Sequence, residues 1–253
     1  MRDFTLQQYE WLVENILQLK LPIFGVLAWS RALPSSGFLV RHDVDRKPAN
    51  ALAMALLEAR LGVQTTYYFR VVGSAYDPVI IRQIAALGHE IGYHYEDLAL
   101  ASGNFAKAHD LFAEHLQQLR GIAEIQTIAM HGSPLSRFNN LDMWRHGTLA
   151  QYGLLTDAFF GIDYTGMPYF TDTGRSWGAD AVNLRDKPET ASLPPASVKS
   201  TRELRSHIEN ALPKRVALSV HPERWASQTS DWWMQLVKDR AVNCAKRVLR
   251  AIR

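Results

Sequence analysis

The sequence predicts an α/β fold: one distorted (β/α)7-type barrel, a single domain with parallel strands. Short runs of β-branched and aromatic residues alternate with helical patterns, as they do when right-handed crossovers join parallel strands. About seven such units in a chain of 253 residues suit one barrel better than two domains. Polar residues also recur where the expected strands end, which is where barrel enzymes place their sites.

The expected elements follow from hydrophobic spacing and from helix-boundary residues. An N-terminal helix over 5–19 and a long final helix over 231–252 are expected to pack on the single domain, 1–253. A sequence typical of a capping box, Ser200 to Glu203, predicts another helix up to residue 212. Further helices are expected over 48–62, 77–88 and 104–119, and strands over 38–45, 63–69, 89–94, 125–130, 154–160, 168–173 and 216–220. The segment 175–195 is expected to be irregular.

Composition and charge narrow the function classes. Apolar residues make up 47% of the chain and charged residues 21%, an ordinary globular balance. The net charge of +3 is too small to indicate a nucleic-acid partner, and we expect none. One cysteine, Cys244, suits a reducing compartment, and neither a signal peptide nor an apolar run of membrane-spanning length is recognised. A cytoplasmic location is therefore expected.

Charged and imidazole side chains follow the expected strands. They are Asp43, Asp45, Arg70, His94, His131 and His221. In a parallel barrel the carboxyl ends of all strands share one face, so these residues can converge although they are far apart in the chain. Two carboxylates and three imidazoles suit a divalent metal such as zinc. Taken singly, Asp45 could instead cap the next helix and each histidine could be solvated, but their recurrence at one edge favours a site.

Four segments, in order along most of the chain, resemble the polysaccharide deacetylases, also called carbohydrate esterase family 4. They are FLVRHDVD at 38–45, GHEIGYH at 88–94, AMHGSP at 129–134 and VALSVH at 216–221, and the second is the most specific. The resemblance implies that Asp43 is the general base that activates a water, and that Asp45 and His94 bind the metal. It also implies that His221, kept protonated, donates a proton to the departing amine.

One ligand position departs from the family pattern. The family has a second metal-binding histidine four residues after the first, and here that position is Leu98, which cannot bind a metal. His131, at the end of the next strand, is the first candidate for the missing ligand. Asp97 is the second candidate, and a site without a third side-chain ligand is the remaining alternative.

The same departure affects the catalytic base. His131 stands roughly where the family has an arginine that orients the catalytic aspartate. Side chains two apart on a strand share a face, so we hypothesise that Arg41 takes over this role beside Asp43.

Candidate substrate contacts follow the strand ends, and the tryptophan and the arginines among them have an alternative. The candidates are Arg41, Arg70, Tyr95, Asp172, Arg175 and Trp177, with Arg185 nearby. The arginines could hold the phosphate or carboxylate of a nucleotide-linked or lipid-linked sugar, and Trp177 could stack on a sugar ring. Alternatively, Trp177 packs in the core and the arginines form ordinary surface ion pairs.

The final helix is basic and begins with two tryptophans, Trp232 and Trp233. A basic helix with aromatic residues can lie on an anionic membrane, so peripheral contact with the inner membrane surface through 231–253 is one expectation. The alternative is that the helix packs its apolar side on the barrel.

The expected function is that of a metal-dependent hydrolase. It would remove an N-acetyl or related N-acyl group from a sugar or sugar precursor in surface-polysaccharide biosynthesis. One alternative is a hydrolase of small amides or cyclic ureides on the same barrel. The other, prompted by Leu98, is a catalytically silent carbohydrate-binding relative, against which the presence of Asp43 and His221 argues.

Overall fold

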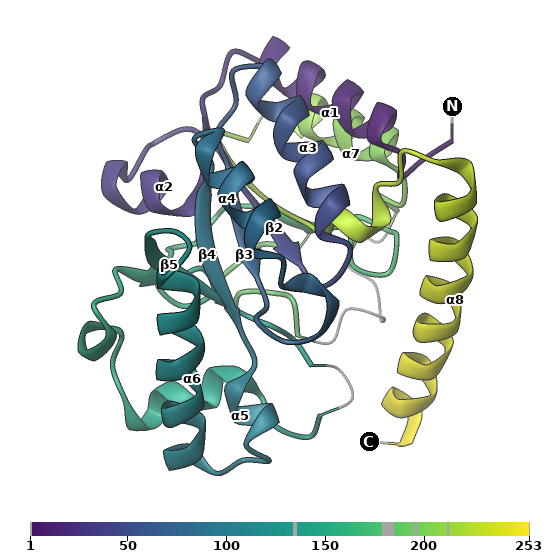
Figure 1. Cartoon of the computed structure of the whole chain (residues 1–253). Helices are drawn as coiled ribbons and strands as arrows, with labels where there is room; N and C mark the ends of the chain where they lie inside the picture. The colour runs from purple at the N-terminus through teal and green to yellow at the C-terminus, as the bar shows by residue number, and fades with distance from the viewer. Residues whose placement is uncertain are drawn as a thin grey trace.

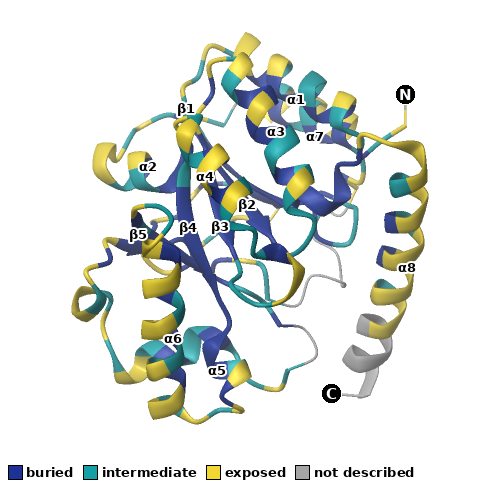
Figure 2. Cartoon of the chain, in the orientation of Figure 1, coloured by how far each residue is buried: buried dark blue, intermediate teal, exposed yellow. Residues whose placement is uncertain are grey.

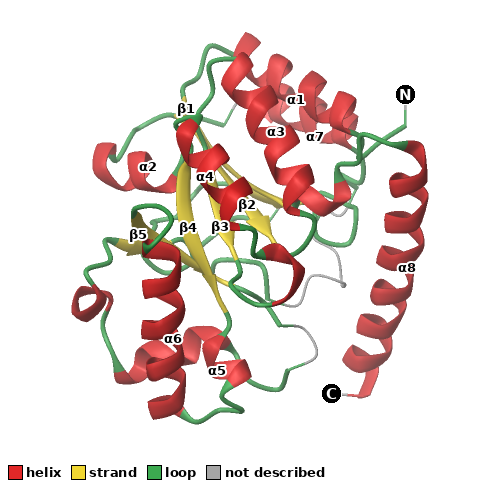
Figure 3. Ribbon diagram, viewed as in Figure 1, coloured by secondary structure: helices red, strands yellow, loops and turns green. Residues whose placement is uncertain are grey.

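The centre of the molecule is a curled parallel sheet covered by helices (Figures 1 and 3). The structure is a computed structural model that describes residues 2–133, 136–178, 185–193, 195, 197–211 and 213–252, with side chains up to residue 245. The strands are β1 (Ile23–Phe24), β2 (Gly37–Val44), β3 (Thr66–Phe69), β4 (Glu90–Tyr95), β5 (Ile125–Met130), β6 (Thr156–Asp157), β7 (Tyr169–Thr171) and β8 (Arg215–Val220).

The strand order is β6-β5-β4-β3-β2-β8-β7, and every pairing along it is parallel. The last strand of the chain, β8, therefore pairs with β2, which is close to the start of the chain. β1 pairs with the start of β2, at Phe38 and Leu39, and β3 pairs with the later part of β2, from Arg41 onward. Strands curled in this order form part of a barrel wall, which confirms the predicted distorted (β/α) barrel.

Helices follow the strands as expected. They are α1 (Leu6–Gln18), α2 (Val26–Ala32), α3 (Pro48–Arg60), α4 (Pro78–Ala86), α5 (Asp97–Leu100), α6 (Phe105–Arg120), α7 (Thr201–Ala211) and α8 (Thr229–Ile252), with short 3₁₀ turns η1 (Gly73–Ala75), η2 (Asn140–His146), η3 (Leu149–Tyr152) and η4 (Pro222–Arg224). Side-chain caps fix several starts, because Thr5, Asp77 and Asn104 accept hydrogen bonds from backbone N–H groups in the first turn. Within the described residues, no helix combines the length and apolarity that crossing a bilayer requires.

The capping box predicted before α7 is present. The backbone N–H of Glu203 donates to Ser200 Oγ at 3.3 Å, and the N–H of Ser200 donates to Glu203 Oε2 at 2.7 Å.

The lengths of two strands were predicted less well than the helices. The strands expected over 154–160 and 168–173 shrink to β6 and β7, and β1 and α2 were not expected at all. Two-residue strands and a seven-residue helix carry too little periodicity to be recognised locally.

Alternation along β2 divides the side chains between two environments. Phe38 and Val40 point to the outer layer, where they pack in one hydrophobic cluster with residues of α1, α3 and α7. His42 points the same way and bonds to Glu58 of α3 at 2.9 Å. Arg41 and Asp43 face the other side, the interior of the curled sheet. The pleat of one strand therefore separates the structural polar network from the candidate site.

Candidate active site

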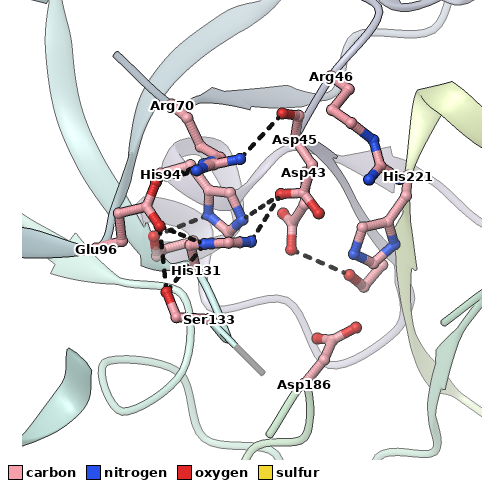
Figure 4. Close-up of polar contacts among 12 residues, drawn as sticks. Asp43, Asp45, Arg46, Arg70, His94, Glu96, His131, Ser133, Asp186 and His221 are labelled. Carbon is pink, nitrogen blue, oxygen red and sulfur yellow. Dashed lines mark hydrogen bonds and ion pairs between the residues drawn. The ribbon is translucent and has the colours of Figure 1, made fainter. Parts of the chain in front are cut away.

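The strand-end residues converge at the carboxyl edge of the sheet (Figure 4). Asp43 and Asp45 come from the end of β2, and His94 comes from β4. His131 and His221 follow β5 and β8 directly. The two imidazoles of His94 and His131 lie on one side of the aspartates, and that of His221 lies on the other. Because the strands are parallel and their ends are aligned, side chains that are up to 178 positions apart, from Asp43 to His221, meet at one edge of the sheet.

Two imidazoles face one oxygen of Asp45. His94 Nε2 lies 3.3 Å and His131 Nε2 lies 3.5 Å from Asp45 Oδ1. Both rings use their other nitrogen as a donor, His94 Nδ1 to the carbonyl of Ala129 at 3.0 Å and His131 Nδ1 to Glu96 Oε2 at 2.9 Å. The two Nε2 lone pairs and the carboxylate oxygen therefore converge, and such an arrangement is stable only with a proton or a cation between them.

Asp45, His94 and His131 are of the residue types that bind divalent cations. The distances of the two imidazoles from Asp45 Oδ1 are also those expected between ligands of one metal ion. Ligands about 2.1 Å from a tetrahedral zinc lie about 3.4 Å from one another. The hydrogen bond from His131 to Glu96 is the carboxylate–imidazole pairing that orients histidine ligands. However, among the residues that the structure describes, no group of three or more His, Cys, Asp or Glu side chains is placed so that it could hold a metal ion as it stands. A metal would require the side chains to adjust.

Glu96 links His131 to the guanidinium group of Arg70. Its Oε1 accepts from Arg70 Nε at 2.6 Å, and its Oε2 accepts from His131 and from Ser133 Oγ at 3.2 Å. Burial alone would raise the pKa of Glu96, but His131 and Arg70 lower it to about 2. The carboxylate therefore stays ionised and holds His131 with its Nε2 toward Asp45.

Asp43 lies between this cluster and His221. Its Oδ2 lies 3.4 Å from Arg41 Nη2 and 3.5 Å from Ser219 Oγ, whereas its Oδ1 is buried without a hydrogen-bond partner. Arg41 also donates to Tyr169 Oη at 2.8 Å and to Asp186 Oδ1 at 3.1 Å. The guanidinium thus lies beside the carboxylate, as the alternation along the strand predicts. The unpartnered Oδ1 can accept a proton from a water.

His221 is held by a buried carboxylate. Its Nδ1 lies 2.7 Å from Asp172 Oδ1, and its backbone N–H donates to Asp172 Oδ2 at 3.0 Å. Trp225 Nε1 and Arg224 Nη1 also donate to Asp172, at 2.8 and 3.3 Å. Burial and Arg224 act to lower the pKa of His221, but Asp172 and Asp186 outweigh them and raise it to about 9. His221 is therefore protonated at neutral pH.

The structure places most of the expected substrate contacts in supporting positions. Arg41 and Tyr95 are buried, and Tyr95 donates to Asp157 at 3.0 Å. Asp172 holds His221 and so supports this imidazole rather than forming a substrate surface. Arg175 is paired with Asp239 of α8 at 3.5 Å. Of this set, Arg70 keeps some exposure, with 20% of its side chain accessible.

Trp177 leaves the substrate set altogether. It is 0% exposed, it donates from Nε1 to Thr201 Oγ1 at 3.2 Å, and its ring packs against Phe4 and Trp225. A sugar ring cannot stack on a side chain in this position. The alternative, core packing, is what the structure shows.

The second candidate ligand, Asp97, also lies elsewhere. It is fully buried and accepts from Tyr93 Oη at 2.8 Å, while His115 Nδ1 lies 2.7 Å from its other oxygen. Leu98 is a core residue. Of the two replacements considered, His131 is the one beside Asp45.

The sequence analysis missed two residues of the site and misjudged the role of a third. Glu96 follows His94 by two positions, a spacing that could have suggested a shared side of the chain. Asp186 comes from the irregular segment, where no periodicity marks it. Arg185 was noted only as a substrate-side arginine, but it donates to the carbonyls of Gly132, Ser133, Ser136 and Phe138. It thereby fastens the segment that carries Asp186 to the loop that carries His131.

Comparison with known proteins yields similarity of fold alone. No protein-family model and no curated protein matches the sequence. Solved structures similar to the chain include a protein from Mycobacterium smegmatis assigned as a polysaccharide deacetylase, with 16% identity, a TM-score of 0.47 and coverage of 84% of this chain and 85% of that one. A family 4 carbohydrate esterase from Bacillus subtilis has 11% identity, a TM-score of 0.36 and coverage of 80% of both chains.

A third similar structure is a pseudoenzyme. This carbohydrate esterase family 4 protein from Bacillus anthracis has 12% identity, a TM-score of 0.42 and coverage of 73% of this chain and 68% of that one. Against two mutants of the same pseudoenzyme, the chain spans 65% and 64% of their length, less than two thirds. The similar structures thus include both enzymes and a pseudoenzyme of the family that the sequence motifs resemble.

Proposed function

We propose that this chain is a divergent relative of the polysaccharide deacetylases that hydrolyses an N-acetyl or related N-acyl group on a sugar or sugar precursor in surface-polysaccharide biosynthesis. The observation that carries the proposal is the position of Asp43. Its unpartnered oxygen lies between a group of metal-type donors, Asp45, His94 and His131, and the protonated imidazole of His221. A base and an acid in one site suit the hydrolysis of an amide.

Each residue has a role that its surroundings support. Asp45, His94 and His131 would hold a divalent cation such as zinc, which supplies Lewis acidity for the amide carbonyl and for the attacking water. Asp43 accepts the proton of that water through its free Oδ1, while Arg41 holds the other oxygen. His221 donates its proton to the leaving nitrogen, which would otherwise depart as a strongly basic anion.

The resting protonation states suit these roles. A general acid has to carry a proton before the reaction, and the pKa of His221, raised to about 9, ensures this at neutral pH. After the proton has left, the negative charge of Asp172 beside the neutral imidazole favours uptake of a new proton from solvent. The pair can therefore turn over without a second acid.

The second candidate function is a silent carbohydrate-binding domain. The observation in its favour is that the three donors are not yet arranged as a complete metal site among the described residues. The chemistry of the donors favours the enzyme, because a binding domain has no use for a buried carboxylate that leaves one oxygen without a partner in a site with a protonated histidine.

Metal content separates the two candidates. We expect about one zinc per chain by elemental analysis, lost in His131→Ala and kept in the control His115→Ala, whose imidazole pairs with Asp97 away from the site. Acetate release from N-acetylated amino sugars should require the metal and fall about 10²–10⁴-fold in Asp43→Asn, the usual contribution of a general base. A parent protein that binds no metal after incubation with zinc, and releases no acetate, would establish the silent domain.

A cytoplasmic setting is part of the same proposal. The single cysteine, Cys244, is a free and exposed thiol, which suits a reducing compartment. There the substrate would be a nucleotide-linked or lipid-linked sugar rather than a finished polymer. Cell fractionation tests this expectation. Recovery of the protein from the space beyond the inner membrane, rather than from the cytoplasm, would contradict it.

A further inference from the structure

Helix α8 is amphipathic in the reverse sense for a surface helix. The most buried positions on the side that faces the body of the protein are polar: Gln235 and Asp239 are 2% and 5% exposed. Trp232, Leu236 and Asn243 are half-buried beside them. The opposite side carries apolar residues in the open, with Trp233 at 53%, Met234 at 62% and Val237 at 65% exposed. A surface helix normally turns its apolar stripe toward the core. Figure 2 shows the alternation of buried and exposed positions along α8.

Specific polar contacts fix this orientation. Asp239 lies 3.5 Å from Arg175 Nη1 and 3.9 Å from Arg224 Nε, and it accepts from Gln235 Nε2 at 3.0 Å. One turn further, Asn243 Nδ2 donates to the carbonyl of Gly174 at 3.0 Å. Rotating the helix to bury its apolar side would remove Asp239 from two arginines. The outward apolar side is thus a consequence of how the helix is attached.

The exposed side is continuous along the described helix. Positions 233, 237, 241 and 244 lie on one side of a helix with 3.6 residues per turn, and 234 and 245 widen it. These positions hold Trp, Val, Ala and Cys, then Met and Ala, and all six are exposed. We call these six residues the outer face of α8. An apolar strip of this length on a surface indicates an interaction partner.

Charge indicates which partner. Helix α8 contains five basic residues, Lys238, Arg240, Lys246, Arg247 and Arg250, and two acidic ones, Asp231 and Asp239. Asp239 is committed to Arg175 on the inner side, whereas Lys238 and Arg240 are exposed beside the outer face. A second copy of the chain would bring the same positive helix against this one, which like charges disfavour. An anionic lipid surface is complementary to both the apolar strip and its basic borders.

We propose that the outer face of α8 binds the surface of a bilayer that contains anionic phospholipid, with the helix lying in the plane of the interface. A helix of 24 residues is about 36 Å long, and the part described lacks the apolarity to cross a bilayer. Trp233, Met234 and Val237 enter the boundary between headgroups and acyl chains, and Lys238 and Arg240 contact the phosphates. Lipid binding at this helix does not require that the site be an active enzyme.

The location of α8 gives the contact a consequence for the site. Asp239 is close to Arg224, and Arg224 donates to Asp172, the carboxylate that holds His221. The docked helix would therefore be linked through Arg224 and Asp172 to His221 of the site. If the function proposed above is correct, this favours a substrate whose sugar is attached to a lipid.

Vesicle flotation with the full chain tests the proposal. We expect the protein to float with vesicles of equal parts phosphatidylcholine and phosphatidylglycerol, and to bind vesicles of phosphatidylcholine alone much more weakly. Val237→Asp should weaken binding about tenfold, since it places a charge in the apolar strip. The double variant Lys238→Glu with Arg240→Glu should weaken it by at least about fivefold for each basic residue removed. Higher salt should weaken binding of the parent.

A matched control distinguishes a local effect from a general one. Val79→Asp introduces the same change on α4, at a position with 61% exposure, and should leave flotation unchanged. Circular dichroism and thermal unfolding of both variants show that they fold. The proposal is overturned if the parent ignores anionic vesicles, or if Val79→Asp and Val237→Asp weaken flotation equally. It is also overturned if light scattering shows a dimer that Val237→Asp dissociates, since a second copy would then occupy the outer face.

Discussion

Replacing Asp172 with asparagine isolates the group that keeps His221 protonated. The carboxylate of Asp172 receives four hydrogen bonds in a fully buried position, two of them from His221. An asparagine has nearly the same shape and retains an acceptor oxygen, but it carries no charge. The substitution therefore removes the main interaction that raises the pKa of His221 and leaves only the smaller effect of Asp186, while burial and Arg224, which lower that pKa, remain.

The expected size follows from proton linkage. The pKa of His221 rises from 6.5 to about 9 on folding, and each unit corresponds to about 1.4 kcal/mol, so the raised value contributes about 3 kcal/mol of stability. Because the folded state holds the proton more tightly, this contribution is complete below pH 6.5 and disappears as the pH rises through 9. In Asp172→Asn the contribution is absent at every pH.

Urea unfolding between pH 6 and pH 9.5, in the presence of a chelator, measures the difference. The parent should lose about 3 kcal/mol more unfolding free energy over this range than Asp172→Asn does. Asp163→Asn, at a fully exposed aspartate, serves as the control and should follow the parent. Parallel curves for the parent and Asp172→Asn would refute the assignment of the raised pKa to this pair. If the deacetylase proposal is correct, the alkaline limb of the activity profile should also move to lower pH in Asp172→Asn.

Two further predictions concern buried residues outside the catalytic pair. Glu58 accepts hydrogen bonds from His42 and Tyr67, and although burial alone would raise its pKa, His42 and other neighbours lower it from 4.5 to about 2. It therefore contributes about 3 kcal/mol above pH 4.5 that is lost as the pH falls to 2, and Glu58→Gln should flatten the acid side of the stability curve; an unchanged acid limb would contradict this. Trp177→Ala should cost about 3–5 kcal/mol in urea unfolding, because it empties a core position beside Trp225. A raised KM with unchanged stability would instead restore Trp177 to the substrate site.

Local sequence was sufficient for the framework of this fold. Runs of β-branched and aromatic residues specify strands, and caps such as Asp77 and Ser200 start helices through bonds to backbone groups two or three residues away. The strand-end residues could also be predicted, because parallel strands necessarily share their carboxyl edge. The proximity of His131 to Asp45 could therefore be predicted from strand direction alone.

The partners of the site residues could not be predicted in the same way. Glu96 and Arg70 position His131, Asp172 positions His221, and the irregular segment delivers Asp186 to Arg41. Most of these pairs join residues that are tens of positions apart. No local period encodes such a contact, since it depends on how whole strands and loops are placed.

The sequence by itself determined the main helices and strands and which chemical groups lie at the strand ends, because both depend on short-range spacing and on the direction of parallel strands. Only the tertiary structure decided that Trp177 is a core residue, that Asp172 serves His221, and that α8 turns its apolar side outward. In each case the physical reason is competition between surfaces. A tryptophan can stack on a sugar or pack in a core, and a helix can bury its apolar face or its polar one. Asp239 and its arginines settle that choice for α8.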